Sequence, residues 1–457
     1  MMETTAQHRD RKVILRRLKG VGYMDHREPH FFHGRLGEGL SSSASSMIAQ
    51  EAGEHDSHSP TLQLQPPTVH WKSSQKPRDD HHTSAEWLTA TEYMDTHPPT
   101  LEWKITTLAH LLLQSRRTVL YTGAGISRAA GIGMAARGGG DTSPKGTMAK
   151  KKKVSVTAQP TITHHALAQL HKHGHIQGGW VQQNHDGLPQ KAGFPQECIN
   201  EIHGSWFDPS NPVVKYSGSL KNHECAWMEQ QCQTADLVIV LGTSLSGLTA
   251  DQVAILAAER SKKGKSLGMV IINLQQTPQD DKTTLRIFGQ SDVILTRLLQ
   301  KMEIPFSTPP TTTTLQLPRR RPRRRVLVPY DRRGRRLDAT DSRTPYMWWD
   351  LSVGAKVRLT QSHNLHGSHQ PHYKCISSIP NPGGIVTKWR DDDFSQSIAI
   401  SLEDGAVSVL LGQWWLDAAV RGGPSQLPLV NVTPKFQYKQ QNKAPTTASD
   451  PCSTAYP

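Results

Sequence analysis

The sequence has few cysteines, few aromatic residues and no long apolar run. Its five cysteines form no CxxC pair, and an odd count without a secretory leader is typical of a reducing compartment, so we expect no disulfide framework and no metal site. The N-terminus, which begins MMETTAQHRD, lacks the apolar core of a signal peptide, and the longest strongly apolar run, at 237–241, is far below the length that spans a bilayer. These absences predict a soluble intracellular protein that makes no membrane contact.

Apolar residues make up 35% of the 457-residue chain, which is enough for one compact domain with long polar extensions. The formal net charge is +14, and residues 319–336 contribute nine of these charges, with ten arginines against the single Asp331. The positive charge is therefore concentrated in a local basic tract suited to acidic partners, and it does not describe the whole fold.

The distribution of polar and apolar residues divides the chain into five segments. Residues 1–88 are rich in Ser, His, Gln and Pro and lack a sustained apolar period, so we expect disorder there. The predicted segments are a disordered N-terminal extension (1–88), a main domain (89–302), a Pro/Thr- and Arg-rich linker (303–344), a small β-rich module (345–435) and a disordered tail (436–457).

The main domain alternates β-type and helical patterns. Apolar runs rich in β-branched residues predict strands, and the segments between them show helical spacing or turn residues. This alternation predicts an α/β fold, a Rossmann-like doubly wound parallel sheet. Strands are expected at 118–122, 179–183, 213–216, 235–243, 268–274 and 292–295, and helices at 99–113, 160–170 and 295–302.

The β-rich module shows a hairpin pattern. Residues 398–411 read as two β-type runs around an Asp-Gly turn, and an amphipathic helix is expected at 414–420.

A glycine-rich turn follows the first predicted strand. Thr118–Gly131 reads TVLYTGAGISRAAG, in which Gly123 and Gly125 let backbone amides approach a pyrophosphate and a helix opening near Ser127 would favour the same anion. Arg128 stands where the strict dinucleotide motif has glycine, so an ordinary strand–turn–helix is the alternative on this motif alone.

Four further motifs follow in order: WVQQNHDGL at 180–188, EIHG at 201–204, DLVIVLGTSL at 236–245 and VIINL at 270–274. Together with the glycine turn they resemble the sirtuin family of NAD-dependent protein deacylases, whose pattern is GAGIS, QNxDG, HG, GTSL and IN. The resemblance covers about residues 90–302. Five motifs in the family's order are far more specific than any one of them.

The resemblance implies NAD as cofactor and assigns roles to single residues. Asn184 and Asp186 would hold the nicotinamide ribose and amide, and His203 would be the general base that deprotonates the ribose hydroxyl. Val214 and Tyr216 would bind the acyl-lysine. Without the resemblance, Asn184 and Asp186 would be explained as a polar turn, and His203 more often as a turn histidine. Strand-end capping would be the preferred explanation of Gly242–Ser244 and Asn273. The implied cofactor-binding residues are Gly123, Ala124, Gly125, Ser127, Gln183, Asn184, Asp186, Gly242, Thr243, Ser244, Asn273 and Leu274.

Several positions depart from the family pattern. Residues 131–137 read GIGMAAR in place of GIPDFR, His185 replaces an aliphatic residue, and Pro189 follows Leu188. Only residues 205–211 separate the His-Gly pair from the strand-like 212–219, where the family has a zinc ribbon with two cysteine pairs. We therefore expect a reduced small domain without structural zinc. The histidines at 363, 366, 369 and 372 fit no zinc spacing and predict a polar loop.

These observations favour an NAD-dependent protein lysine deacetylase or deacylase, a transferase that moves the acyl group of a lysine, for example of a histone, to ADP-ribose and releases nicotinamide. The alternatives are a catalytically weak or inactive NAD- or ADP-ribose-binding scaffold on chromatin or nucleic acid, and an NAD glycohydrolase. The arginines at 319–325, with 332–336 as a second half, predict residence in the nucleus, with the cytoplasm as the alternative, and a weak contact of Arg319–Arg336 with nucleic acid.

Overall fold

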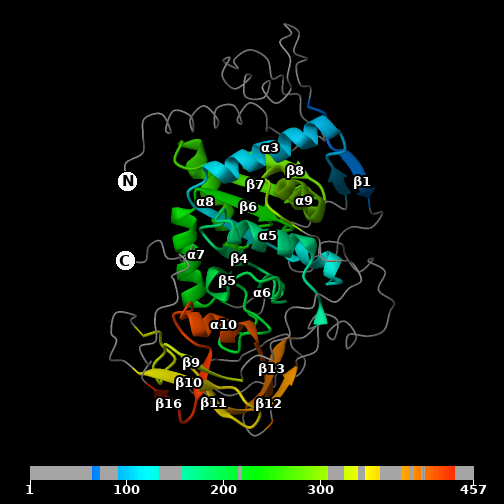
Figure 1. Cartoon of the computed structure of the whole chain (residues 1–457). Helices are drawn as coiled ribbons and strands as arrows, with labels where there is room; N and C mark the ends of the chain where they lie inside the picture. The colour runs from blue at the N-terminus through cyan, green and yellow to red at the C-terminus, as the bar shows by residue number, and fades with distance from the viewer. Residues whose placement is uncertain are drawn as a thin grey trace.

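The computed structural model describes residues 64–72, 91–132, 157–214, 219–306, 324–337, 345–360, 382–390, 396–402, 405 and 407–437. These residues form an α/β domain and, beneath it in Figure 1, a domain of antiparallel strands with one helix. Residues 215–218, 319–323 and 363–375 lie outside the described residues, and with them the expectations for Tyr216, the first arginines and the His-rich loop.

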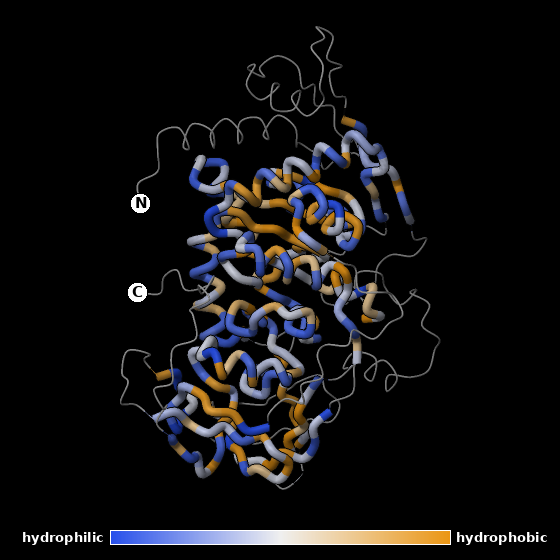
Figure 2. The backbone as a smooth tube through the Cα atoms, viewed as in Figure 1, coloured by the Kyte–Doolittle hydropathy of each residue, from blue (hydrophilic) through white to orange (hydrophobic). Residues whose placement is uncertain are grey.

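The α/β domain is built on a six-stranded parallel sheet with the order β5-β4-β3-β6-β7-β8. Both faces of its central strands are buried, and the strand residues accordingly read as continuous apolar runs, orange in Figure 2. The predicted strands near 118, 180, 237 and 268 are confirmed. The bounds are β3 Thr118–Thr122, β4 Trp180–Gln182, β5 Ile199–Glu201, β6 Leu237–Leu241, β7 Gly268–Asn273 and β8 Leu285–Phe288.

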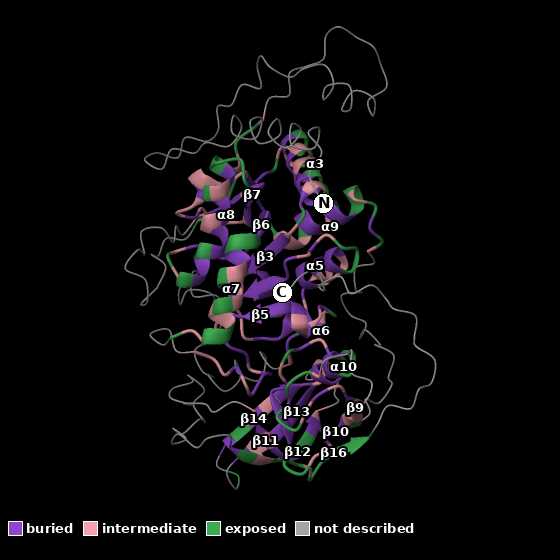
Figure 3. Cartoon of the chain, turned by 90° about the vertical axis from the view of Figure 1, so that its left-hand side faces the viewer, coloured by how far each residue is buried: buried purple, intermediate pink, exposed green. Residues whose placement is uncertain are grey.

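Helices cover both faces of this sheet. Alternate strand residues face opposite ways, so Ile239 packs in the core formed with α3, α5 and α9, whereas Val238 packs in the core formed with α7 and α8. The buried core of the domain is the purple region around β3 and β6 in Figure 3. The predicted doubly wound fold class is confirmed. The helices are α3 Pro98–Gln114, α5 Ile162–Lys172, α6 Leu188–Lys191, α7 Asn222–Thr234, α8 Gln252–Lys262 and α9 Ser291–Lys301, with the 3₁₀ turns η2 Ala124–Ala130, η4 Gln196–Cys198, η5 Thr249–Asp251 and η6 Asp280–Lys282.

A β-hairpin precedes the sheet. β1 (Thr68–Lys72) pairs antiparallel with β2 (Thr91–Met94), so the expectation of disorder throughout 1–88 is wrong for β1. The backbone N–H of Tyr93 donates to the Leu274 carbonyl, and that of Asp95 donates to the Phe288 carbonyl, both at 2.8 Å. These bonds fix the hairpin against the ends of β7 and β8.

Two strand predictions in the α/β domain are wrong. Residues 292–295 lie in α9, and the edge strand is β8 instead. β8 escapes detection because it contains Arg286, a buried cation whose Nε lies 3.0 Å from Asp280 and whose guanidinium stacks 3.7 Å from the Phe288 ring. Val213 and Val214, the described part of the expected strand 213–216, lie outside any strand.

The C-terminal β-domain consists of two antiparallel sheets and α10 around a separate apolar core. The predicted hairpin (β13 and β14) and the predicted helix are confirmed. The expectation of a linker over 303–344 is wrong at β9, which pairs with β10. The strands are β9 Arg325–Val328, β10 Tyr346–Asp350, β11 Lys356–Leu359, β12 Gly383–Arg390, β13 Ser397–Leu402, β14 Val407–Gly412, β15 Leu429–Asn431 and β16 Lys435–Gln437, and α10 is Trp414–Arg421.

Among the described cysteines, Cys225 and Cys232 are free. Cys198 is buried. No helix in the described part of the chain combines the length and apolar character needed to cross a membrane. Nor do the described residues bring three or more His, Cys, Asp or Glu side chains together as a candidate metal site.

The buried His164 should make stability depend on pH. Burial, with His165 adding to it, lowers the pKa of His164 to about 3, so the folded state keeps the ring neutral while the unfolded chain protonates it below its ordinary pKa of 6.5. Between pH 6.5 and pH 5 this difference should remove about 2 kcal/mol of stability. The stability is present above pH 6.5 and is lost as the pH falls toward 3.

Urea unfolding at pH 7 and pH 5 tests this effect in wild type and His164→Asn. The asparagine oxygen can still accept the Thr161 N–H that His164 Nδ1 accepts at 3.2 Å, although the stack on Trp180 is lost at every pH. The variant should start less stable and show the smaller loss on acidification. The exposed His110→Asn serves as control. Equal pH dependence in His164→Asn and wild type would contradict the assignment.

Candidate functional site

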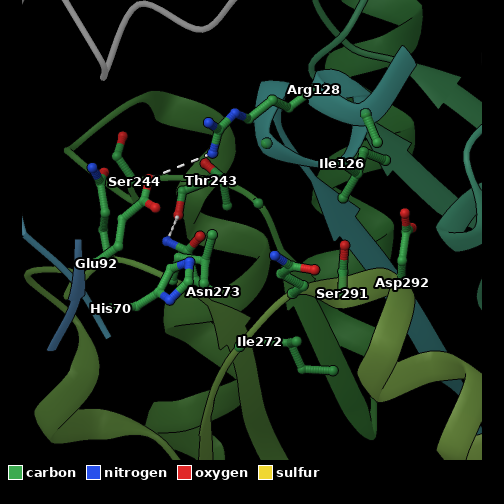
Figure 4. Close-up of a pocket in the computed structure, with 17 residues that line it drawn as sticks. His70, Glu92, Ile126, Arg128, Thr243, Ser244, Ile272, Asn273, Ser291 and Asp292 are labelled. Atoms are coloured by element: carbon green, nitrogen blue, oxygen red, sulfur yellow. Dashed lines mark hydrogen bonds and ion pairs between the residues drawn. The ribbon is translucent and has the colours of Figure 1, made fainter. Parts of the chain in front are cut away.

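A pocket of about 370 Å³ opens at the carboxyl ends of the parallel strands, where open α/β sheets place their ligands (Figure 4). Its volume lies in the range of small-molecule sites. Six residues expected to bind the cofactor line it: Gly125, Gly242, Thr243, Ser244, Asn273 and Leu274.

The turn after β3 and the turn after β6 meet backbone to backbone beside this pocket. The Gly125 N–H donates to the Gly242 carbonyl at 2.8 Å, and a Cβ on Gly125 would lie 2.7 Å from the Gly242 Cα. Gly242 itself has φ +60°, and a Cβ there would lie 2.6 Å from the Ile126 nitrogen. Glycine is needed at both positions because the two turns touch.

The structure corrects the expected helix opening at Ser127. Residues 124–130 form the 3₁₀ turn η2, so Ser127 lies in the middle of a turn and is fully buried. Its Oγ donates to Asp186 Oδ2 at 2.7 Å. Ser127 therefore links the glycine turn to the QNxDG segment. Because no helix begins at Ser127, the expected anion site at a helix N-terminus is not formed there.

Asn184, Asp186 and Ser127 form one polar cluster. Asn184 Nδ2 donates to Ser127 Oγ at 3.0 Å and to the Gly123 carbonyl at 3.1 Å, while Asp186 Oδ1 accepts the Leu188 N–H at 3.0 Å. Burial raises the pKa of Asp186, although its bonds from Ser127 and Leu188 oppose the shift. The cluster thus brings an amide and a carboxyl group to the end of β4 in fixed orientations.

Thr243 connects this cluster to the pocket. Its Oγ1 accepts a hydrogen bond from Gln183 Nε2 at 3.0 Å, and its carbonyl accepts one from Asn273 Nδ2 at 3.1 Å, the latter drawn in Figure 4. Gln183 comes from the QNxDG segment and Asn273 from the end of β7. Segments ninety residues apart in the sequence therefore meet around one threonine.

His203 lies two residues beyond β5 and beside the QNxDG segment. Burial, with His185 adding to it, lowers the pKa of His203 to about 4, and a hydrogen bond with the Gln183 backbone opposes the shift. The ring is thus neutral at physiological pH, the form that accepts a proton. Its carbonyl accepts the Val214 N–H at 2.9 Å, which brings the described part of the expected substrate segment next to the histidine.

Several pocket residues escaped the sequence reasoning. His70 and Glu92 come from the hairpin β1–β2, and Gly289–Asp292 follow β8. Ligand contacts are expected just beyond the end of a parallel strand. Because the sequence pattern predicted the strand at 292–295 and not at β8, Gly289–Asp292 were missed. Glu92 is buried and lies 3.6 Å from Arg128, whose side chain extends over the pocket in Figure 4.

The pocket residues fit the nucleotide half of a dinucleotide. Hydroxyl and amide groups of Thr243, Ser244, Asn273 and Ser291 border it, and the buried Gln275 Nε2 has no hydrogen-bond partner within the described residues. An unpaired buried donor at a pocket wall suits a ligand acceptor. Ala124 is half-buried in the glycine turn and, like Gly123, does not line this pocket.

A parallel doubly wound sheet with a glycine turn and a pocket at its carboxyl edge defines a Rossmann-like nucleotide-binding domain. Curated proteins of the sirtuin family, among them proteins named NAD-dependent protein deacetylases, are similar to this chain over somewhat less than half of its length. It is 30% identical to the NAD-dependent protein deacetylase SRT1 of Arabidopsis thaliana over 249 residues, which cover 45% of this chain and 50% of that protein. Over 271 residues it is 29% identical to the NAD-dependent protein deacetylase Sirt6 of Drosophila melanogaster, covering 48% and 81%.

Human NAD-dependent protein deacetylase sirtuin-7 is 28% identical over 260 residues, covering 46% of this chain and 62% of that protein. The matches to the two SRT1 proteins each cover 50% of the relative, so the chain spans about half of their length. No family model matches the chain. A solved structure described as Sir2 with a p53 peptide and NAD⁺ gives a TM-score of 0.36 at 23% identity, covering 44% of this chain and 99% of that one.

Gly125→Ala should destabilise the α/β domain. The added Cβ would meet Gly242 backbone atoms at 2.7 and 2.8 Å, and backbone on both sides cannot move away as a flexible side chain can. We expect a loss of about 1–3 kcal/mol in unfolding followed by tryptophan fluorescence, as for other overpacked sites.

Gly383→Ala is the matched control, because its added Cβ would have only the Val357 carbonyl oxygen nearby, at 3.9 Å. It should change stability by less than about 0.5 kcal/mol. A Gly125→Ala protein as stable as the control would show that the two turns do not require this close approach.

Proposed function

We propose that this chain is an NAD-dependent protein lysine deacylase that transfers the acyl group of a lysine to ADP-ribose and releases nicotinamide. The observation that carries the proposal is the position of His203 beside the QNxDG segment, where it hydrogen-bonds with the Gln183 backbone next to Asn184. Gln183 in turn bonds Thr243, which lines the nucleotide-sized pocket. The curated relatives are named as NAD-dependent protein deacetylases, which supports the same activity.

Each group of residues has a task in this reaction. NAD, when bound, supplies a glycosidic bond to nicotinamide and a ribose that accepts the acyl group. The pocket around Thr243 and Asn273 would hold the adenosine half, and Asn184 and Asp186 would orient the nicotinamide half. His203, neutral in the folded protein, would take the proton from a ribose hydroxyl.

The substrate side rests on the segment after His203. Val214 is tied to the His203 carbonyl, so an extended acyl-lysine peptide lying along this segment would pass beside the base. Tyr216 belongs to the same proposed substrate segment. A lysine side chain of a protein, for example of a histone, is the substrate class that this arrangement suits.

His203→Ala should lower kcat for deacylation by ~10²–10⁴-fold, the usual effect of removing a general base. The dissociation constants of NAD and ADP-ribose, measured by isothermal titration calorimetry, should change little because the pocket lies on the other side of Gln183. Acetylated histone peptide with NAD and mass spectrometry of the products measures the reaction. His110→Ala controls for loss of an exposed histidine.

Full NAD-dependent deacetylation by His203→Ala would refute the role of this residue. Nicotinamide release by the wild type without any acyl-peptide would favour an NAD glycohydrolase, in which water replaces the acyl oxygen. NAD binding without nicotinamide release, tested over several acyl chains, would favour an inactive scaffold. The loss of the PDFR sequence and the shortened segment 205–211 are the features that keep these alternatives in view.

The basic tract supports a nuclear location and a contact with nucleic acid. Its described arginines include Arg324, Arg325, Arg332 and Arg333, all exposed, and Arg325 begins β9. The described part of the tract therefore belongs to a folded domain, which holds these four arginines at its surface. Phosphate contacts from such groups are independent of base sequence and sensitive to salt.

Replacing the arginines at 319–325 with serine should shift a fluorescent fusion from the nucleus toward the cytoplasm. It should also weaken binding to a short single-stranded DNA and flatten the dependence of that binding on salt, because fewer counterions are released. Arg297→Ser with Lys301→Ser, on α9, is the control for removing cations elsewhere on the surface, with two charges changed against six in the tract. An unchanged distribution of the fusion would exclude targeting by the tract.

A further inference from the structure

The C-terminal β-domain contacts the α/β domain through α10, which touches η4 and lies next to α6 in Figures 1 and 3. α10 divides its side chains between two neighbours. Trp415, Leu416 and Ala419 lie in the core of the β-domain, whereas the indole of Trp414 reaches the α/β domain. Trp414, which is only partly buried against the core of its own domain, therefore makes the contact between the two domains.

Trp414 touches the segment that replaces the small domain. Its ring meets Phe207 edge to face, with centroids 5.3 Å apart, and the neighbouring Gly412 N–H donates to the Phe207 carbonyl at 3.0 Å. Phe207 is fully buried and belongs to the short stretch 205–211. This stretch is thus held by the β-domain through both a ring contact and a backbone bond.

Trp414 also packs on the Asp-Gly turn of the site. A Cβ built on Gly187 would lie 2.8 Å from Phe207 Cδ2 and 2.9 Å from Trp414 Cη2, and Gly187 has φ +64°. Only glycine fits under these rings in this conformation. Since Gly187 directly follows Asp186, the two rings fix the backbone that carries Asp186, whose carboxyl group is expected to bind nicotinamide.

A buried hydrogen-bond chain runs from the same indole toward His203. Trp414 Nε1 donates to Gln196 Oε1 at 2.7 Å, and Gln196 Nε2 donates to Glu201 Oε2 at 3.4 Å. Gln190 Nε2 also donates to Gln196 Oε1, at 3.2 Å. Gln190, Gln196 and Glu201 are each more than nine-tenths buried, and Glu201 ends β5 two residues before His203.

Another polar contact between the described parts of the two domains lies at the rim. Arg421 pairs with Glu197 at 3.1 Å, but the Arg421 side chain is 53% exposed. An exposed ion pair of this kind contributes little to stability. The orientation of the two domains near the site therefore depends mainly on Trp414 and its partners.

We propose that the C-terminal β-domain is part of the catalytic site, with Trp414 as a positioning residue that fixes the Asp186–Gly187 turn and the β5–His203 segment. The stretch 205–211 is too short to cover this side of the site alone. The β-domain, although it comes from the far end of the chain, forms the wall there. The effect on turnover rests on the proposed deacylase function, whereas the effect on local order does not.

The first test measures local order in the full-length chain by amide hydrogen exchange. Trp414→Ala should accelerate exchange at least ~10-fold in peptides covering 185–208, since local opening there loses its cover. Trp414→Phe keeps a ring over Gly187 and loses only the N–H donor, so its effect should be smaller. Gln196→Leu breaks the same hydrogen bond from the other side and also removes the bonds to Gln190 and Glu201, so it should accelerate exchange more than Trp414→Phe does.

Trp348→Phe is the matched control. Its indole Nε1 also donates to a glutamine oxygen, that of Gln437 at 3.0 Å, but within the sheet β16-β10-β9 of the same domain. The substitution therefore removes the same kind of bond away from the interface. Exchange in 185–208 should match the wild type.

The second test separates positioning from simple loss of fold. Trp414→Phe and Trp414→Ala should lower kcat/KM for an acetylated peptide progressively, by about 10-fold or more for the alanine variant, while the dissociation constant of ADP-ribose stays within about twofold of the wild type. ADP-ribose binding reports the adenosine pocket, which α10 does not touch.

Unchanged exchange in 185–208 for both Trp414 variants would overturn the proposal. So would progressive loss of ADP-ribose affinity in parallel with activity, because that would indicate general unfolding of the α/β domain. A wild-type protein that never releases nicotinamide would refute the proposed deacylase function, while the exchange experiment would still decide whether the β-domain orders the site.

Discussion

The contact between the glycine turns after β3 and β6 is the constraint on which the site depends. Because Gly125 and Gly242 meet without side chains between them, the ends of two parallel strands come close enough to share backbone hydrogen bonds. Thr243 then lies within reach of both Gln183 and Asn273. The pocket and the polar cluster are consequences of this approach, since a larger residue at either position would separate the turns.

The polar groups of the site are held mostly by one another. The buried Ser127 hydroxyl donates to the buried Asp186 carboxylate and accepts from the half-buried Asn184 amide, which keeps both groups in place. Burial shifts the pKa of Asp186 upward and that of His203 downward, so both changes favour the uncharged forms. Hydrogen bonds therefore fix the orientation of Asn184 and Asp186, and burial keeps the His203 ring neutral.

Much of the fold could be predicted from sequence because the central strands are buried on both faces and carry uninterrupted apolar runs. The edge strand β8 could not, since Arg286 interrupts its pattern and is compensated only by Asp280 from elsewhere in the chain. The expected site residues fell at strand ends, where local pattern and ligand geometry agree. Glu92 and Trp414 could not be found this way, because each reaches the site by tertiary packing from a segment outside the motifs.

The hairpin β1–β2 bears on where the folded unit begins. The family resemblance starts near residue 90, between its two strands, yet β1 contributes His70 and β2 contributes Glu92 to the pocket wall. A fragment cut at the edge of the recognisable motifs would separate paired strands and leave β2 as an unpartnered edge against the ends of β7 and β8. The folded domain therefore begins at about Thr68, some twenty residues before the segment that resembles the family.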